Sequence, residues 1–246
     1  MSWFSTHIVA AAALLLAAHV ANGAVPDFSG TWERYPDPYS PDRFDPDPAP
    51  PAGGPKLKEP YAREFREFNR HKAEADKQGR PLPDPATRCL PEGMPTIMAA
   101  VEAIEIVQTQ RQIVVLAEFL TQTRRIYLNE KMPPLEDLSP GYNGYSVGHW
   151  DGETLVVETK GIREDVKFMG IPRSAQMKVT ERLRLTAPGL LENQITIDDP
   201  GVLARPYAFT FGYKRNPDYR ILEYICDNNR NRFEADGSVS LEVTPK

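Results

Sequence analysis

The sequence predicts an all-β fold in which an antiparallel meander closes into a barrel or folds into a sandwich. Short runs of alternating apolar and polar residues follow one another through most of the 246-residue chain after Pro95. Turn signals such as Asp151-Gly152 separate these runs, and no helical pattern intervenes that could carry parallel crossovers. So many short strands require closure or a second sheet, because an open sheet would expose its edges.

We expect three regions: a signal peptide over residues 1–23, a proline-rich leader over 24–95 and a β-barrel-like domain over 96–246. A short strand is also expected within the leader, at Phe28–Tyr35. The candidate strands of the last region lie at Val101–Gln108, Gln112–Glu118, Thr123–Leu128, Tyr145–Trp150, Glu153–Lys160, Lys178–Leu185, Leu190–Ile197, Tyr207–Tyr213, Tyr219–Cys226 and Val239–Val243.

One amphipathic helix is expected near residues 61–78. Tyr61, Phe65 and Phe68 recur three and four residues apart among charged residues, and Gly79 begins a stop signal. Its aromatic stripe is predicted to dock on the body of the protein. The preceding segment, residues 36–60, begins with too many prolines for a helix or a central strand, and whether it covers the mouth of a barrel stays open.

The first residues have the pattern of a secretory signal. Ile8–Ala21 is apolar but shorter than the roughly 20 residues that span a membrane, and small residues follow it. We expect cleavage after Gly23, a periplasmic or secreted protein, and no membrane span after signal removal. A retained anchor is the alternative, because no Lys or Arg precedes the apolar run.

The predicted export bears on whether the two cysteines form a disulfide. Cys89 and Cys226 are the only ones in the chain, and an even number in an oxidising compartment favours a disulfide. Closing so long a loop could stabilise the fold by roughly 4 to 5 kcal/mol in the chain-entropy model. Two buried free thiols are the alternative interpretation.

Composition and motifs argue against several function classes. The net charge of −5 leaves no basic excess for nucleic acid. Only His71 and His149 remain after signal removal, too few for the usual histidine-rich metal site. The sequence has no Walker loop or Rossmann fingerprint. We therefore expect no metal, no cofactor and no nucleic-acid partner, and the oligomeric state stays open.

The stretch YSVGHWDGETLVVETKG, Tyr145–Gly161, predicts a β-hairpin. With Asp151-Gly152 as the central residues of a type I′ turn, His149 would pair with Thr154. One face would carry Tyr145, Val147, His149, Thr154, Val156 and Glu158. The other would carry Ser146, Gly148, Trp150, Glu153, Leu155 and Val157. Both faces are mixed in polarity, so either can be internal.

The candidate acid and base residues lie on these strands. His149 could act as a general acid or base tuned by Glu158, or it could be an ordinary exposed strand residue. Alternation with apolar neighbours predicts three inward glutamates, Glu118, Glu181 and Glu223. With Arg125, Tyr127 or Arg182, they would form an internal ion network or a site with shifted pKa values.

Several motifs carry a resemblance to a known family. They are CLPEGMP (Cys89–Pro95), RRIYLNEKMPP (Arg124–Pro134), the Tyr145–Gly161 hairpin, TERLRL (Thr180–Leu185) and ITIDDP (Ile195–Pro200). The hairpin motif G-H/R-W-D/E-G-D/E-T-L-V-V-D/E-T resembles that of a widespread family of secreted bacterial β-rich proteins. Gly30-Thr31-Trp32 is also similar to the Gly-x-Trp start of lipocalins, which implies a lipocalin-like or calycin-like barrel. Neither resemblance assigns catalytic residues.

Two functions fit these observations. The first is an exported β-barrel that binds a small hydrophobic or amphipathic molecule in its interior, oriented by Arg125 or by Glu118, Glu181 or Glu223. The expected lining is Tyr127, Tyr145, Trp150, Phe209, Phe211 and Tyr224. The alternative is a cofactor-free lyase, isomerase or hydratase that uses His149 with an inward glutamate as acid and base. A purely structural envelope role is a third interpretation.

Overall fold

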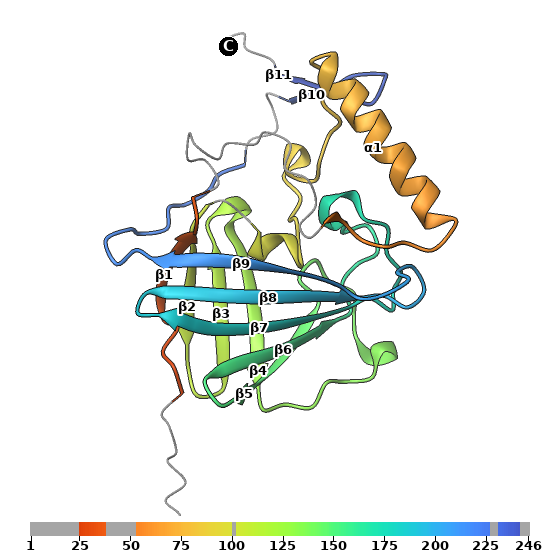
Figure 1. Cartoon of the computed structure of the whole chain (residues 1–246). Coiled ribbons are helices and arrows are strands. Elements are labelled where there is room, and N and C mark those ends of the chain that lie inside the picture. The colour runs from red at the N-terminus through yellow and green to blue at the C-terminus, as the bar shows by residue number, and fades with distance from the viewer. Residues whose placement is uncertain (1–24, 38–52, 100–101, 227–230, 242–246) are drawn as a thin grey trace, which may run out of the picture.

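The computed structural model describes residues 25–37, 53–99, 102–226 and 231–241. Nine strands form a closed barrel in which each strand pairs with its neighbours in sequence and β9 pairs with β1 (Figure 1). The all-β barrel prediction is therefore confirmed, and the sandwich is not formed. The predicted signal peptide lies outside the described residues.

The barrel strands are β1 (Gly30–Arg34), β2 (Ile104–Gln108), β3 (Gln112–Ala117), β4 (Gln122–Leu128), β5 (Tyr145–Asp151), β6 (Thr154–Lys160), β7 (Lys178–Ala187), β8 (Leu190–Asp198) and β9 (Tyr207–Arg215).

The remaining elements are short apart from one helix. The helix is α1 (Tyr61–Lys77), as expected from the aromatic spacing, and none of the described helices is long and apolar enough to span a membrane. A separate two-stranded sheet pairs β10 (Asn231–Phe233) with β11 (Val239–Leu241). Single 3₁₀ turns lie at Ala86–Arg88, Thr96–Met98, Phe119–Thr121, Leu135–Asp137 and Phe168–Gly170.

One strand pair departs from the expected antiparallel meander. β4 and β5 are parallel, with Ile126 opposite Ser146 and Leu128 opposite Gly148. The connection over residues 129–144 allows this, because a parallel pair needs a crossover of about a dozen residues or more. We expected no parallel pair because no helical pattern separates the strands in the sequence, and this connection runs mainly without a helix.

The predicted strand Tyr219–Cys226 is not formed. This segment has no regular structure, whereas the strand before it continues to Arg215. β9 pairs with β1 and β8, so the barrel is already closed and offers no edge to a further strand. Of the predicted strand Val239–Val243, the part within the described residues is β11, and residues 242–243 lie outside them.

Alternation along each strand fills the barrel with side chains. On β8, Leu191, Asn193, Ile195 and Ile197 are buried, whereas the residues between them are exposed or half-buried. Equivalent positions on the other strands join them in one continuous core. Since apolar burial is the dominant favourable term in folding, this packed interior is the main source of stability.

The hairpin of β5 and β6 turns one residue later than predicted. Asp151 pairs with Thr154, so Gly152 and Glu153 are the central residues, and Gly152 takes a φ of 59°. The expected pairing of His149 with Thr154 is therefore wrong; His149 pairs with Val156. The two faces keep their predicted members apart from Glu153, because the register changes by an even number of positions. The face with Gly148, Leu155 and Val157 is the internal one.

A tryptophan closes the barrel at the end where β1 begins. The Trp32 indole Nε1 donates to the Phe28 carbonyl at 2.8 Å, and the Arg215 guanidinium lies 4.6 Å from the centre of the Trp32 ring. Arg215 also donates to the Ser29 carbonyl at 2.7 Å. Trp150 packs against Phe28 with the ring centres 5.2 Å apart. These contacts bind the first and last strands together.

The helix docks on the barrel through its N-terminal half. Phe65 packs against the core, and Gly170 lies under the Phe68 ring so closely that a Cβ at Gly170 would collide with it. Figure 1 shows the helix projecting beyond the barrel, with its C-terminal end beside the small β10–β11 sheet. Arg80 joins the two by an ion pair with Asp236 at 2.8 Å. The predicted docking role of the aromatic stripe agrees with these contacts.

The predicted disulfide is present between Cys89 and Cys226. It connects the segment before β2 to the irregular segment after β9, across 137 residues of sequence. Thr121 Oγ1 donates to the Tyr224 carbonyl at 3.0 Å and holds the same segment against the β3–β4 turn. The disulfide therefore ties an otherwise weakly attached C-terminal segment to the barrel.

Reducing the disulfide, or replacing both cysteines by serine, should lower the free energy of unfolding by up to about 5 kcal/mol, because the unfolded chain regains the entropy of a long loop. Urea denaturation of the oxidised, reduced and Cys89→Ser/Cys226→Ser proteins measures this difference. An unchanged midpoint in all three would show that the disulfide contributes nothing to the stability of the barrel.

Candidate functional site

A buried ionic network occupies the middle of the barrel. Arg124 on β4 reaches Glu181 on β7 with both terminal nitrogens, one of them at 3.1 Å from Oε1. The same guanidinium donates to Ser146 Oγ at 3.3 Å and Thr159 Oγ1 at 3.1 Å. Asn193 Nδ2 donates to Glu181 Oε1 at 2.9 Å. The two charges are therefore paired and hydrogen-bonded, as burial requires.

The network leaves no space in the middle of the barrel. The Arg124 and Glu181 side chains are 1% and 0% exposed, so no water-sized cavity adjoins them. A ligand bound at this depth, as the sequence led us to expect, has no room there. The inward position of Glu181 was predicted, but its partner was expected to be Arg125 or Arg182. Both of those arginines are exposed on the outside of the barrel.

The candidate acid and base do not meet. His149 is exposed on the outer surface, whereas Glu181 lies inside the barrel. Glu158 also faces outward, where Lys160 Nζ lies at 3.1 Å and Lys178 Nζ at 3.8 Å from its carboxylate. Because the barrel wall separates His149 from Glu181, the two side chains cannot act on one substrate atom.

The other two predicted inward glutamates face elsewhere. Glu118 follows the end of β3, where it accepts hydrogen bonds from the Tyr219 hydroxyl at 2.8 Å and the Leu222 amide at 3.2 Å. Glu223 is exposed in the irregular segment. The prediction chose the wrong face of β3: its buried residues are Ile113, Val115 and Ala117. Both faces of β3 are largely apolar, so alternation along this strand does not show which face is internal.

The predicted ligand-lining residues divide between the two sides of the barrel wall. Phe209 and Phe211 are buried in the interior. Trp150 closes the barrel end against Phe28, and Tyr224 packs on Phe119 outside the strands. Tyr127 and Tyr145 stack on each other on the outer surface, with ring centres 5.1 Å apart. The structure therefore does not gather these residues into one site.

One further arginine, which is not among the predicted site residues, lies at the end of the first barrel strand. Arg34, the last residue of β1, has its guanidinium carbon 4.0 Å from the centre of the Phe211 ring. One terminal nitrogen donates to the Ala99 carbonyl at 3.1 Å, whereas the buried Nε has no acceptor among the described residues. Within the described residues, Arg34 has no carboxylate partner. Burial lowers the pKa of Arg34, which is the direction expected when a cation loses water.

The signal for Arg34 was present in the sequence. Arg34 stands two residues after Trp32, and strand alternation places both on the same face. An inward Trp32, as the Gly-x-Trp start implied, therefore predicts an inward Arg34 at the end of the strand. The predicted orienting charges, Arg125 and the inward glutamates, all lie after residue 96, whereas Arg34 lies before it.

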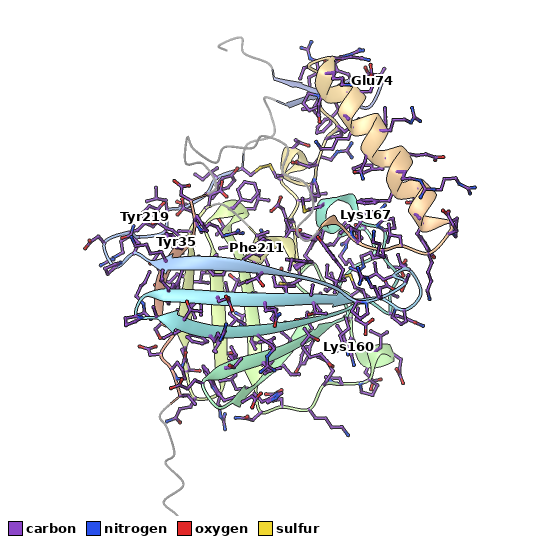
Figure 2. The ribbon with its side chains drawn as sticks, viewed as in Figure 1. Tyr35, Glu74, Lys160, Lys167, Phe211 and Tyr219 are labelled. Carbon is purple, nitrogen blue, oxygen red and sulfur yellow. A yellow bond between two sulfur atoms is a disulfide. The ribbon has the colours of Figure 1, made fainter. Side chains whose placement is uncertain are left out.

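Aromatic rings extend from Arg34 into the barrel. Phe211 lies next to Phe209 with ring centres 5.2 Å apart, and Phe168 stacks on Phe209 at 4.9 Å. Phe211 is 8% exposed, and Phe168 and Phe209 are 5% exposed, so all three rings are buried beside Arg34. Figure 2 shows the labelled Phe211 beside β9. We use the name barrel mouth for Arg34, Ala99, Phe168, Phe209 and Phe211. It offers a cation with free hydrogen-bonding capacity next to an apolar aromatic wall.

A titratable carboxyl group lies in the CLPEGMP segment. Burial, together with the nearby carboxylates of Asp84 and Glu102, raises the pKa of Glu92 to about 7. The next residue, Gly93, donates its amide to Gln122 Oε1 at 3.2 Å, and Met94 is part of the core. Glu92 is therefore held half-buried by a segment that packs on the barrel. No signal in the single sequence distinguished it from other glutamates.

The described part of the chain contains no group of three or more histidine, cysteine or acidic residues that could hold a metal ion. A surface pocket of about 620 Å³ is lined on the outside of the barrel by Thr109, Gln110, Arg111, Gln112, Tyr127 and Glu130.

Comparisons with known proteins leave the family open. No protein-family model and no curated protein matches the chain. Among solved structures, a mutant of the fluorescent protein UnaG is 18% identical and covers 77% of this chain and 96% of its own, with a TM-score of 0.32. Wild-type UnaG is 21% identical over 46% of this chain and 72% of its own, with a TM-score of 0.27. At such TM-scores the superposition is only partial, and the barrel assignment rests on the strand pairing itself.

Replacing one member of the buried pair should be strongly destabilising. Arg124→Met or Glu181→Leu leaves the other side chain without its partner in the interior, which typically costs about 3 to 5 kcal/mol. The double variant Arg124→Met/Glu181→Leu should recover much of this loss, because neither charge remains. Urea unfolding of the four proteins gives the coupling energy. Additive effects of the two substitutions would contradict a direct ion pair.

The contribution of Glu92 to the free energy of unfolding should fall as the pH rises, whereas most carboxylates in folded proteins contribute more at higher pH. Its pKa is higher in the folded state than in the unfolded chain, so its protonated form favours folding and this contribution is lost as the pH rises from about 4.5 to about 7. Glu92→Gln should therefore be more stable than the wild type by about 1 to 3 kcal/mol at about pH 8, with the difference shrinking toward low pH.

Thermal or urea unfolding over this pH range tests the Glu92 prediction, and Glu136→Gln provides an exposed control. A stability difference between Glu92→Gln and the wild type that stays constant with pH would mean that Glu92 titrates normally.

Proposed function

We propose that this protein is an exported β-barrel that binds a small amphipathic molecule at the barrel mouth, with an anionic head group against Arg34. The observation that carries the proposal is the Arg34 guanidinium, which lies on Phe211 with a buried Nε that has no acceptor. The proposal places the ligand at the rim, since the Arg124–Glu181 network fills the middle of the barrel.

The chemistry of Arg34 favours an anionic partner. A guanidinium offers five N–H donors in a fixed plane, and one donor of Arg34 is used by Ala99. Partial burial weakens its hydration, so a carboxylate or phosphate that accepts two of the remaining donors would compensate for this cost. The stacked Phe211 ring holds the plane of the guanidinium in place and presents the unused donors along its edge.

The aromatic wall favours an apolar tail on the same ligand. Phe168, Phe209 and Phe211 provide adjoining rings next to the cation, and ligand sites typically combine such an apolar lining with one or two polar anchors. A fatty acid or a related amphipathic acid has both parts. Whether residues 36–60 help to cover the ligand stays open, because most of them lie outside the described residues.

Export and family membership belong to the same proposal. The signal-like residues 1–23 support export, and the Cys89–Cys226 disulfide is compatible with an oxidising compartment. The motif resemblance to secreted bacterial β-rich proteins and the Gly-x-Trp start remain predictions from the sequence.

Isothermal titration with fatty acids and the matched fatty alcohols tests the proposal. The acids should bind more tightly than the alcohols, and Arg34→Met should weaken acid binding about 10- to 100-fold, the value of a charged hydrogen bond, while leaving alcohol binding nearly unchanged. Arg184→Met is the control, because Arg184 is an exposed arginine on the outside of β7. Equal affinities for acid and alcohol, or an Arg34→Met protein that binds as the wild type does, would refute the role of Arg34.

A further inference from the structure

The outer surface of the barrel carries a pocket. It is about 620 Å³ and lies around the turn between β2 and β3 and the end of β4. Its six lining residues are Thr109, Gln110, Arg111, Gln112, Tyr127 and Glu130. Because Arg124 and Ile126 of β4 point inward, Tyr127 between Ile126 and Leu128 points to the outside. The pocket is therefore separated from the barrel interior by the wall itself.

One wall of this pocket is a fixed aromatic ring. Tyr127 stacks on Tyr145 of the neighbouring strand with an angle of 26° between the rings. The Tyr145 hydroxyl donates to Glu130 Oε2 at 3.2 Å, so the second ring is anchored at its far end. This arrangement holds the Tyr127 ring in place, and a held ring binds a flat partner with little loss of side-chain entropy.

The polar side chains around the ring are available for a ligand. Among the described residues, the side chains of Gln110, Arg111 and Gln112 make no hydrogen bond or ion pair with the protein. The two amides can both donate and accept, the guanidinium donates, and the Glu130 carboxylate accepts. The Thr109 hydroxyl and the Gln112 backbone bond to each other and fix the turn that carries these groups.

From this combination we propose that the outer pocket is a saccharide-binding site. A sugar ring presents a face of C–H groups, which suits the negative face of Tyr127, and hydroxyl groups that both donate and accept. Arg111 and Glu130 bring opposite charges to the same pocket, so the site suits a neutral polar ligand better than an anion or a cation. A purely apolar ligand would leave four polar side chains without partners.

The saccharide site is independent of the proposed function at the mouth. Its residues lie on the outside of β4 and on the β2–β3 turn, whereas Arg34 and Phe211 lie inside the barrel at its mouth. Binding of a fatty acid should therefore not displace a sugar, and Arg34→Met should leave sugar binding unchanged. These two controls separate failure of one proposal from failure of the other.

The experiment is an NMR titration of the full chain with a panel of neutral hexoses, N-acetylated amino sugars and disaccharides. We expect at least one of them to shift the amide signals of residues 109–112, 127 and 130 in a saturable way. Tyr127→Leu, which removes the aromatic face, should weaken that binding at least tenfold, whereas Tyr127→Phe should retain it. Arg111→Ala should also weaken it, and Arg205→Ala, an exposed arginine in another loop, should not.

Two outcomes would overturn the saccharide proposal. The first is the absence of saturable shifts at these residues for every sugar in the panel. The second is binding that is equally strong in the Tyr127→Leu and Arg111→Ala proteins, which would place the sugar elsewhere. Circular dichroism of each variant distinguishes loss of binding from loss of the barrel.

Discussion

The Arg124–Glu181 ion pair is the constraint on which the rest of the molecule depends. It joins β4 to β7 across the inside of the barrel, and Ser146, Thr159 and Asn193 complete its hydrogen bonds. Since a buried charge without its partner costs several kcal/mol, the alternation of both strands is fixed with these two residues inward. The pair also fills the interior, and so it confines ligand chemistry to the rim and the outer surface.

The barrel wall divides the chemistry of the protein into two kinds. Inward positions near the rim combine the cationic Arg34 with aromatic rings, which suits an amphipathic acid. Outward positions of β4 and the β2–β3 turn combine one held ring with amides and opposite charges, which suits a neutral polar ring. Neighbouring side chains of a strand point to opposite faces of the wall, so the wall keeps these two environments apart.

Local patterns predicted most of the architecture. Eight of the later strands follow alternating runs, α1 follows its aromatic spacing, and the disulfide follows from two cysteines in a chain that carries a signal-like start. The parallel pairing of β4 with β5 and the irregular course of residues 219–226 could not be predicted in this way. Both depend on which strand edges remain free once the barrel closes, and closure is a property of all nine strands together.

The sequence by itself determined the alternation along the barrel strands, the aromatic spacing of the helix and which residues share a strand face. Only the tertiary structure decided which face is internal where both faces are mixed, as on β3 and β5. It also decided that Glu181 meets Arg124 and that Arg34 stays without a carboxylate partner among the described residues. The physical reason is that alternation acts between neighbouring residues, whereas the cost of burying a charge depends on a partner supplied by a strand far away in sequence.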